Sequence, residues 1–152
     1  MKNHRYEGGV LMFIKQISVF VENKQGRLAN VTEVLASAGV NLRAMSMADT
    51  SDFGILRLIV DDNDKAMKAL KDASFAVSQT DVIAVAFDDE VGAMARTLKI
   101  FEESNINIEY LYVFFAQNDN KVVTVFRVVD ADSAIEALKE KNICVLAEED
   151  IK

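Results

Sequence analysis

A short polar loop that ends in glycine is the part of the sequence best suited to hold a small anion. Residues 19–28 read as the end of a strand, a polar loop and the start of a helix, with Gly26 just before the helix. A strand that enters a helix through a glycine leaves free backbone N–H groups at the helix start, where the helix dipole is positive. A carboxylate would fit there, although a glycine in such a loop can also serve as a plain turn.

A second loop of the same kind supports the binding interpretation. Gly92 follows Gly26 by 66 residues, within the segment 85–94, and Asn107 follows Asn41 by the same interval. Internal repeats define the architecture of a chain before any single element does. Two copies of this size indicate two small related domains rather than a solenoid.

The two loops must be positioned by two copies of one order of elements. In the first copy hydrophobic periodicity predicts strands at 14–21, 40–48, 54–60 and 75–78, and helices at 27–38 and from 61–64 onward. In the second copy it predicts strands at 82–87, 106–116, 121–129 and 143–146, and helices at 93–104 and 130–141. We therefore expect two ferredoxin-like βαββαβ units of the α+β class, with antiparallel sheets and helices on one face. They would cover residues 12–80 and 81–152, after a flexible N-terminal extension of residues 1–11.

Composition restricts the class of function. The chain has 152 residues, of which 51% are hydrophobic and 27% charged, and this is typical of a globular protein. The net charge of −7 disfavours nucleic acid as a partner. No apolar segment is long enough to span a membrane. The same fold can bind RNA, but that use requires stacking aromatic residues and a basic patch, which the charge opposes.

The residues that could carry catalysis or bind metal are few. Cys144 is the single cysteine, which excludes an internal disulfide and fits a reducing cytoplasm. We expect it to be a buried structural thiol, because His4 is the only histidine and lies in the terminal extension. The sequence has no histidine dyad and no glycine-rich phosphate loop, so we expect neither an enzyme nor a cofactor. We expect the acidic run 88–90 to be solvated; the alternative is that it receives an ammonium group or a basic side chain, and a metal site is less favoured.

The strand that follows the first helix of each copy has apolar residues on both faces. Leu42, Ala44 and Ser46 alternate with Arg43, Met45 and Met47, and Leu111 and Val113 occupy the matching strand of the second copy. We expect a homodimer, or an intimate two-domain monomer, to bury Met45, Met47, Leu111 and Val113; a membrane or ligand surface is the alternative. Arg57 and Arg127 recur at matching places and should pair with carboxylates such as Glu109.

These motifs resemble the ACT domain, a small βαββαβ module that binds amino acids and regulates metabolic enzymes. The resemblance rests on Glu22-Asn-Lys-Gln-Gly-Arg-Leu28 with Gly39-Val-Asn41, and on Asp89-Glu-Val-Gly92 with Asn107. It covers about residues 12–151. Gln25 and Val91 stand where that family usually has proline. The resemblance implies ligand-binding positions at Asn23, Lys24, Gln25, Gly26, Arg27, Leu28, Asn41, Asp89, Gly92, Ala93, Met94 and Asn107.

The resemblance also implies a function without catalysis. A free amino acid would bind at an interface between ACT units, with no cofactor and no metal. The alternative is a regulatory subunit that docks on a separate enzyme of amino-acid metabolism, as the small subunits of acetolactate synthase do. Lys24 and Arg27 in the first loop, against the acids at 88–90 in the second, predict that the ligand carboxylate prefers the helix after Gly26 by about 1 kcal/mol.

Overall fold

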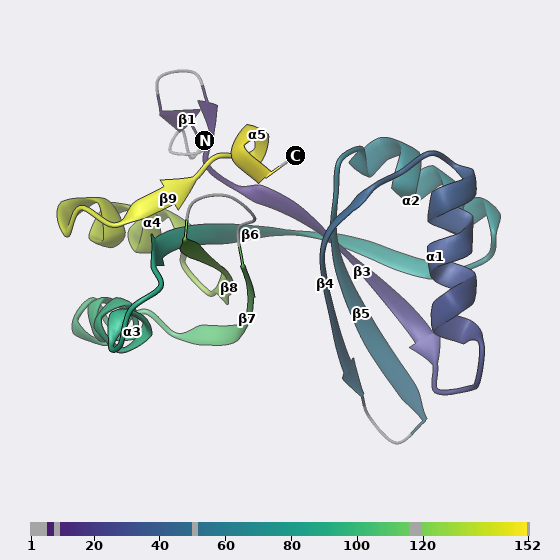
Figure 1. Ribbon diagram of the computed structural model, residues 1–152, viewed down its shortest axis with the longest axis horizontal. Helices are drawn as coiled ribbons and strands as arrows, with labels where there is room; N and C mark the ends of the chain where they lie inside the picture. Colours follow the sequence, from purple (N-terminus) through teal and green to yellow (C-terminus); the bar gives the residue numbers. More distant parts are fainter. Residues whose placement is uncertain (1–5, 8–9, 50–51, 116–119, 152) are drawn as a thin grey trace. The chain divides into compact units, whose positions relative to one another are not determined.

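The computed structural model describes residues 6–7, 10–49, 52–115 and 120–151, which fold as two compact units. Residues 15–80, with 151–152, form one unit, which we call the first module. Residues 81–150, together with 1–14, form the other, which we call the second module. Figure 1 shows the helices and strands of each module.

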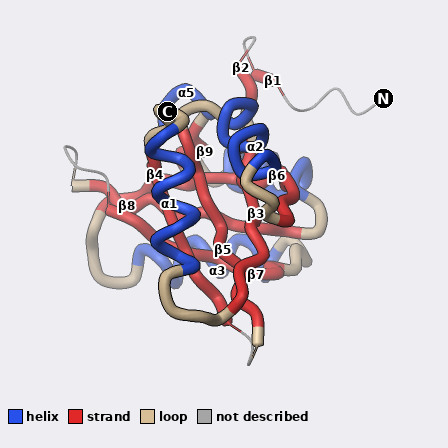
Figure 2. The backbone as a smooth tube through the Cα atoms, turned by 90° about the vertical axis from the view of Figure 1, so that its right-hand side faces the viewer, coloured by secondary structure: helices blue, strands red, loops and turns tan. Residues whose placement is uncertain are grey.

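The first module has the predicted βαββαβ order. Its elements are β3 (Ile14–Glu22), α1 (Arg27–Ser37), β4 (Leu42–Asp49), β5 (Phe53–Val60), α2 (Asn63–Asp72) and the first part of β6 (Ala76–Asp88). The strands lie in the order β4-β5-β3-β6, with β5 antiparallel to both β3 and β4. Helices α1 and α2 cover one face of this sheet, and Figure 2 looks onto them. The buried side chains between the layers include Ile17, Val19, Leu56, Leu58, Val31, Leu35, Ala66 and Leu70.

The second module repeats this arrangement. After the second part of β6 come α3 (Ala93–Glu103), β7 (Ile108–Phe115), β8 (Lys121–Val128), α4 (Ala131–Glu140) and β9 (Cys144–Leu146), followed by a short α5 (Glu148–Ile151). The strands lie in the order β9-β6-β8-β7, all antiparallel. Phe101 of α3 packs on Phe126 of β8 with ring centroids 4.9 Å apart. The predicted α+β fold of two ferredoxin-like units is confirmed.

Strand β6 is one continuous strand of 13 residues, where the sequence predicted two separate strands at 75–78 and 82–87. Its residues up to Thr80 belong to the first module and those from Asp81 to the second. Residues 79–81 contain neither glycine nor proline, so nothing in the sequence forces a turn between the two parts. A single extended segment therefore closes one unit and opens the next.

The predicted flexible extension of residues 1–11 lies mostly outside the described residues, which include only residues 6–7 and 10–11 of it. Tyr6–Glu7 (β1) pairs antiparallel with Val10–Leu11 (β2). Met12 and Phe13 are only 7% and 4% exposed and pack in the core of the second module. That core is thus completed by residues that precede the first module in the chain. Local periodicity cannot report a contact of such long sequence separation.

A β-bulge in each module corrects the predicted faces of β4. Leu42 pairs with Val60 but Ala44 pairs with Ile59, so the register shifts by one residue at Arg43. Such an extra residue moves every later side chain to the other face. Leu42 therefore lies on the same face of the sheet as Met45 and Met47, not on the face of Ala44 as simple alternation predicted. The same shift occurs between Ile108 and Tyr110 in β7.

Register also corrects the expectation that Arg57 and Arg127 occupy matching positions. Arg57 lies opposite Ser18 and Ser46, whereas Arg127 lies opposite Tyr110. Tyr110 corresponds to Ala44, whose partner is Ile59. The β7–β8 connection is two residues longer than the β4–β5 connection, so the repeat interval changes from 66 to 68 after it. The predicted ion pair is confirmed for Arg127, whose Nε lies 3.1 Å from Glu109 Oε2.

The thiol of Cys144 is exposed, so its predicted burial is wrong. Cys144 is the first residue of β9, a three-residue strand that borders the sheet and pairs only with β6 among the described strands. A residue at the end of an edge strand has few neighbours to cover it. Within the described ranges, no helix is sufficiently long and apolar to span a membrane.

Candidate functional site

The first glycine loop is a tight turn held by backbone hydrogen bonds. Asn23 N–H donates to Asp52 O at 3.0 Å, and Lys24 N–H donates to Glu22 O at 2.8 Å. Gly26 adopts a left-handed conformation with φ of 84° and forms the N-cap of α1. L-residues rarely adopt that region, which explains why glycine stands there.

The second loop repeats this backbone bond for bond. Asp89 N–H donates to Asn120 O at 3.2 Å, and Glu90 N–H donates to Asp88 O at 2.9 Å. Gly92 has φ of 87° and forms the N-cap of α3. The next hydrogen bond also repeats, since Arg96 N–H reaches Gly92 O at 3.0 Å, as Asn30 N–H reaches Gly26 O at 2.9 Å. The sequence repeat is therefore a repeat of loop geometry.

Helices α1 and α3 begin differently from the other two long helices of the same chain. Asp62 caps α2 by accepting from Lys65 N–H, and Asp130 caps α4 by accepting from Ser133 N–H. Among the described residues, no side chain caps α1 or α3, and neither has an acid in its first turn. A helix start leaves its first N–H groups without intrahelical partners. The N-termini of α1 and α3 are thus the helix starts suited to an external anion.

The charges around the first loop are paired. Glu22 contacts Lys24 Nζ at 2.9 Å and Arg27 Nη2 at 3.1 Å. The hydrogen bond from Lys24, followed by the one from Arg27, lowers the pKa of the Glu22 carboxyl below its ordinary value. The prediction that a ligand carboxylate prefers the first loop took Lys24 and Arg27 into account but not Glu22. The paired group of Glu22, Lys24 and Arg27 therefore carries one net positive charge.

The second loop is likewise more balanced than its acidic run indicates. Lys121 Nζ lies 2.6 Å from Asp88 Oδ1, and Arg96 Nη2 pairs with Glu90. With Asp89 included, the group carries one net negative charge. Neither Arg96 nor Lys121 was identified from the sequence. Lys121 is 33 residues from its partner and is brought to it by the β6–β8 register, whereas Arg96 could have been found one helical turn after Gly92.

Two of the three predicted asparagines, Asn41 and Asn107, lie away from the loops, whereas Asn23 is part of the first loop. Asn41 follows the C-terminal end of α1, where its N–H donates to Asp61 Oδ1 at 2.9 Å, and Asn107 occupies the matching place after α3. An 11-residue helix is about 16 Å long, so Gly26 and Asn41 lie at opposite ends of α1. One module does not bring both to a single small ligand. Leu28 and Met94 occupy matching positions after the two glycines but differ in environment. Leu28 is 39% exposed, whereas Met94 packs against the core of the second module.

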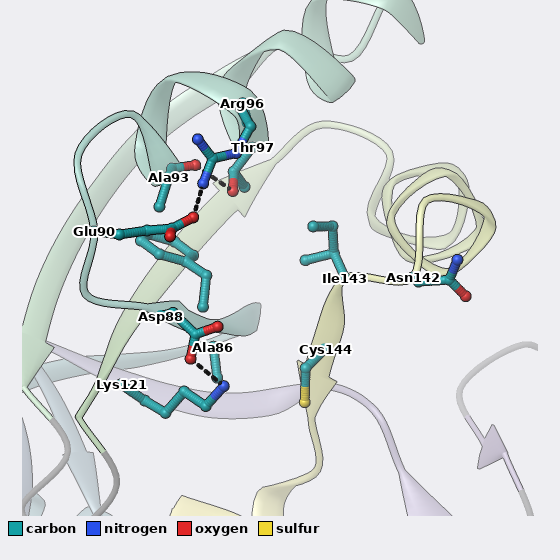
Figure 3. A pocket seen from close by; sticks show the side chains of 11 residues that line it. Ala86, Asp88, Glu90, Ala93, Arg96, Thr97, Lys121, Asn142, Ile143 and Cys144 are labelled. Carbon is teal, nitrogen blue, oxygen red and sulfur yellow. Dashed lines mark hydrogen bonds and ion pairs between the residues drawn. The ribbon is translucent and has the colours of Figure 1, made fainter.

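A pocket adjoins the second loop within the second module (Figure 3). It has a volume of about 250 Å³ and lies between the β6–α3 loop, the start of α3 and the α4–β9 connection. Glu90 and Arg96 line one side, and Ile143 and Cys144 line the opposite side. Of the predicted site residues, only Ala93 lines it. The charged pairs and the small apolar residues give this pocket the means to bind a molecule with both charges.

Comparisons with known proteins agree with this architecture. The family model described as an ACT domain pair matches residues 12–152. The solved structure of protein BT0572 from Bacteroides thetaiotaomicron is 48% identical, with a TM-score of 0.87 over 92% of this chain and 96% of that chain. None of the curated proteins compared with the chain matches it.

More distant structures share the fold. The regulatory subunit of aspartate kinase from Thermus thermophilus is 16% identical, with a TM-score of 0.60 over 83% of this chain and 90% of that chain. The corresponding subunit from Thermus flavus is 18% identical, with a TM-score of 0.59 over the same shares. Together with the duplicated loops and the paired βαββαβ modules, the family match leads to one conclusion: the chain belongs to the ACT domain pair family.

Proposed function

We propose that this protein is a non-catalytic regulator that binds a free amino acid at a glycine loop of its ACT modules. The observation that carries the proposal is the contrast among the helix starts. Two helices are capped by aspartate, whereas the two that follow the glycine loops are not. A helix start without an acid can accept the ligand's α-carboxylate on its N–H groups.

The charged side chains beside each loop supply the other half of amino-acid recognition. A free amino acid carries an ammonium group as well as a carboxylate, and each loop presents both acids and bases. These pairs are partly exposed, so exchange of one partner for a ligand group costs little. Binding would order the loop and shift the population of states that a partner recognises.

Calorimetry on glycine variants tests this function. In Gly26→Ala and Gly92→Ala, the left-handed backbone disfavours the new side chain, which moves the N–H groups away from the ligand. Gly39→Ala is the matched control, because Gly39 is also left-handed, at φ of 70°, but lies at the far end of α1. We expect at least one loop variant to lose affinity for an amino acid that the wild type and Gly39→Ala bind. Asn23→Ala should weaken binding at the first loop by roughly 1–3 kcal/mol. Failure of every common amino acid to bind the wild type would reject the function.

A second candidate is supported by exposed apolar side chains on the border strands β4 and β7. Met45 and Met47 are 49% and 42% exposed, and Leu111 and Val113 are 39% and 43% exposed. Such residues on border strands favour a protein partner. We propose a second copy as the partner, with a separate metabolic enzyme as the alternative. The regulatory subunits of aspartate kinase among the similar structures agree with that alternative only at the level of fold.

Light scattering separates these partners. A homodimer predicts twice the mass of one chain, and Met45→Lys with Leu111→Lys should return it to the monomer mass. A chain that is monomeric before substitution would contradict the homodimer and leave the enzyme as the partner to test, by co-purification with an added amino-acid kinase.

A further inference from the structure

We propose that the pocket beside the second glycine loop holds a free amino acid with a small or apolar side chain. This inference rests on the proposed function and assigns the ligand to one module. The volume of about 250 Å³ lies below the roughly 300–1,000 Å³ of pockets for drug-sized ligands, and so suits a smaller molecule.

The rim of the pocket matches both charges of an amino acid. Arg96 and Lys121 can receive the carboxylate, and Asp88 and Glu90 can receive the ammonium. At present these groups satisfy each other, as the dashed lines in Figure 3 show. The side chains of Arg96 and Glu90 are 60% and 59% exposed, so water screens their attraction and the pair contributes little to stability. A ligand that offers a matching charge to each partner can therefore replace this pairing without leaving a charge unpaired.

The remaining wall selects the side chain of the ligand. Apart from the two charged pairs, no charged side chain among the described residues lines the pocket. Ala86, Phe87, Ala93 and Ile143 are apolar, and the polar members are Asn142 and Thr97, whose hydroxyl already donates to Ala93 O at 3.0 Å. A charged ligand side chain would lose its hydration there without a partner of opposite charge. The wall thus favours aliphatic amino acids over acidic or basic ones.

The first module has larger side chains at three of the corresponding positions. Ala86 and Ala93 correspond to Phe20 and Arg27 by the 66-residue interval, and Ile143 corresponds to Phe75 by the 68-residue interval. The first module also lacks a cation at the position of Lys121. Lys121 pairs with Asp88 across β6 and β8, whereas Phe53 pairs with Glu22 at the corresponding place across β3 and β5. The two copies keep the same loop backbone but differ in side-chain volume, so space for a ligand is provided in the second module. The sequence predicted that the ligand prefers the first loop, but that prediction did not take the charge of Glu22 into account. The side-chain volumes favour the second loop instead.

Cys144 provides a direct reporter of occupancy, because it is the only cysteine and its exposed thiol lines the pocket. The full chain is labelled with a maleimide in the presence of glycine, alanine, valine, leucine, aspartate or lysine, each added separately. We expect an aliphatic amino acid to slow labelling saturably, by about tenfold at ten times its Kd. Aspartate and lysine should protect less at the same concentration.

Variants separate binding in this pocket from binding elsewhere. Arg96→Ala and Lys121→Ala should abolish the protection, whereas Lys99→Ala should retain it. Lys99 is the matched control because it lies on the same helix in an exposed pair with Glu102. Thermal unfolding verifies that each variant is folded. Calorimetric binding of an amino acid without protection of Cys144 would overturn this pocket but leave the proposed function standing, whereas absence of any binding would reject both.

Discussion

The two glycine loops share a backbone but differ in their side chains. Gly26 and Gly92 have φ values of 84° and 87°, and the hydrogen bonds around them correspond one to one. Glu22 is paired with two cations of its own loop, whereas Asp88 is paired with Lys121 from a neighbouring strand. The comparison shows that the two copies share the loop backbone, whereas the volume and the charge of the surrounding side chains differ.

The largest expected effect concerns how each module completes its core. Phe13→Ala should lower the free energy of unfolding by about 3–5 kcal/mol, because a buried aromatic side chain is removed from the second core. Hydrogen exchange should show the loss of protection around Ile83 and Val85. Phe20→Ala is the matched control, since Phe20 is 49% exposed. Equal losses in the two variants would contradict this account of the second core.

The next effect tests whether the two loops are equivalent in backbone. Gly26→Ala and Gly92→Ala should each lower the free energy of unfolding by about 1–2 kcal/mol, because each residue is left-handed. A Cβ at Gly26 meets no atom within 4 Å, whereas one at Gly92 lies 3.2 Å from the flexible end of Arg96. Chemical denaturation of both variants measures the comparison, and stability unchanged in either would show that its loop relaxes to another conformation.

The capped helices offer a contrast of similar or smaller size. Asp62→Ala and Asp130→Ala should each lower the free energy of unfolding by about 1 kcal/mol, because each removes an N-cap acceptor. Conversely, Gly92→Asp places a carboxylate at the start of α3 and should weaken amino-acid binding in the second module, because its negative charge opposes the ligand carboxylate. Denaturant titrations give the first result and calorimetry the second. Stronger binding in Gly92→Asp would contradict the role of the open helix start.

The smallest effect concerns the pH dependence of the first loop. The pKa of Glu22 is lowered in the folded state by Lys24 and then by Arg27. Its contribution to stability is therefore present above the pKa of the unfolded chain and is lost as pH falls through the lowered folded value. Lys24→Ala should return the Glu22 pKa toward its ordinary value, as measured by NMR titration of the side-chain carboxyl. A Glu22 pKa that is the same in both proteins would contradict the pairing.

Much of the fold could be predicted from the sequence because its signals are local. Periodicity placed α1 and α3 to within one residue at their ends, and the glycine and asparagine at positions 39 and 105 have the expected positive φ. The contribution of Met12 and Phe13 to the second core could not be predicted, since both residues precede the whole first module in the sequence. The bulges at Arg43 and Glu109 were not predicted either, because a one-residue shift of register leaves no local signal in the sequence.

The candidate site was predictable in its backbone but not in its side-chain environment. Gly26 and Gly92 were found because glycine marks a left-handed loop directly. Lys121 was missed because only strand register brings it to Asp88. The exposure of Cys144 depends on its place at the end of a border strand, which hydrophobicity alone does not reveal.

The most direct test of amino-acid binding at the glycine loops is an NMR titration of the uniformly ¹⁵N-labelled chain with each common amino acid. The amide signals of Gly26, Arg27, Gly92 and Ala93 report on the two helix starts. We predict saturable shifts at one pair or both for at least one amino acid, with those of Gly92 and Ala93 larger if the pocket in the second module is used. Absence of saturable shifts at both pairs would contradict binding at the glycine loops.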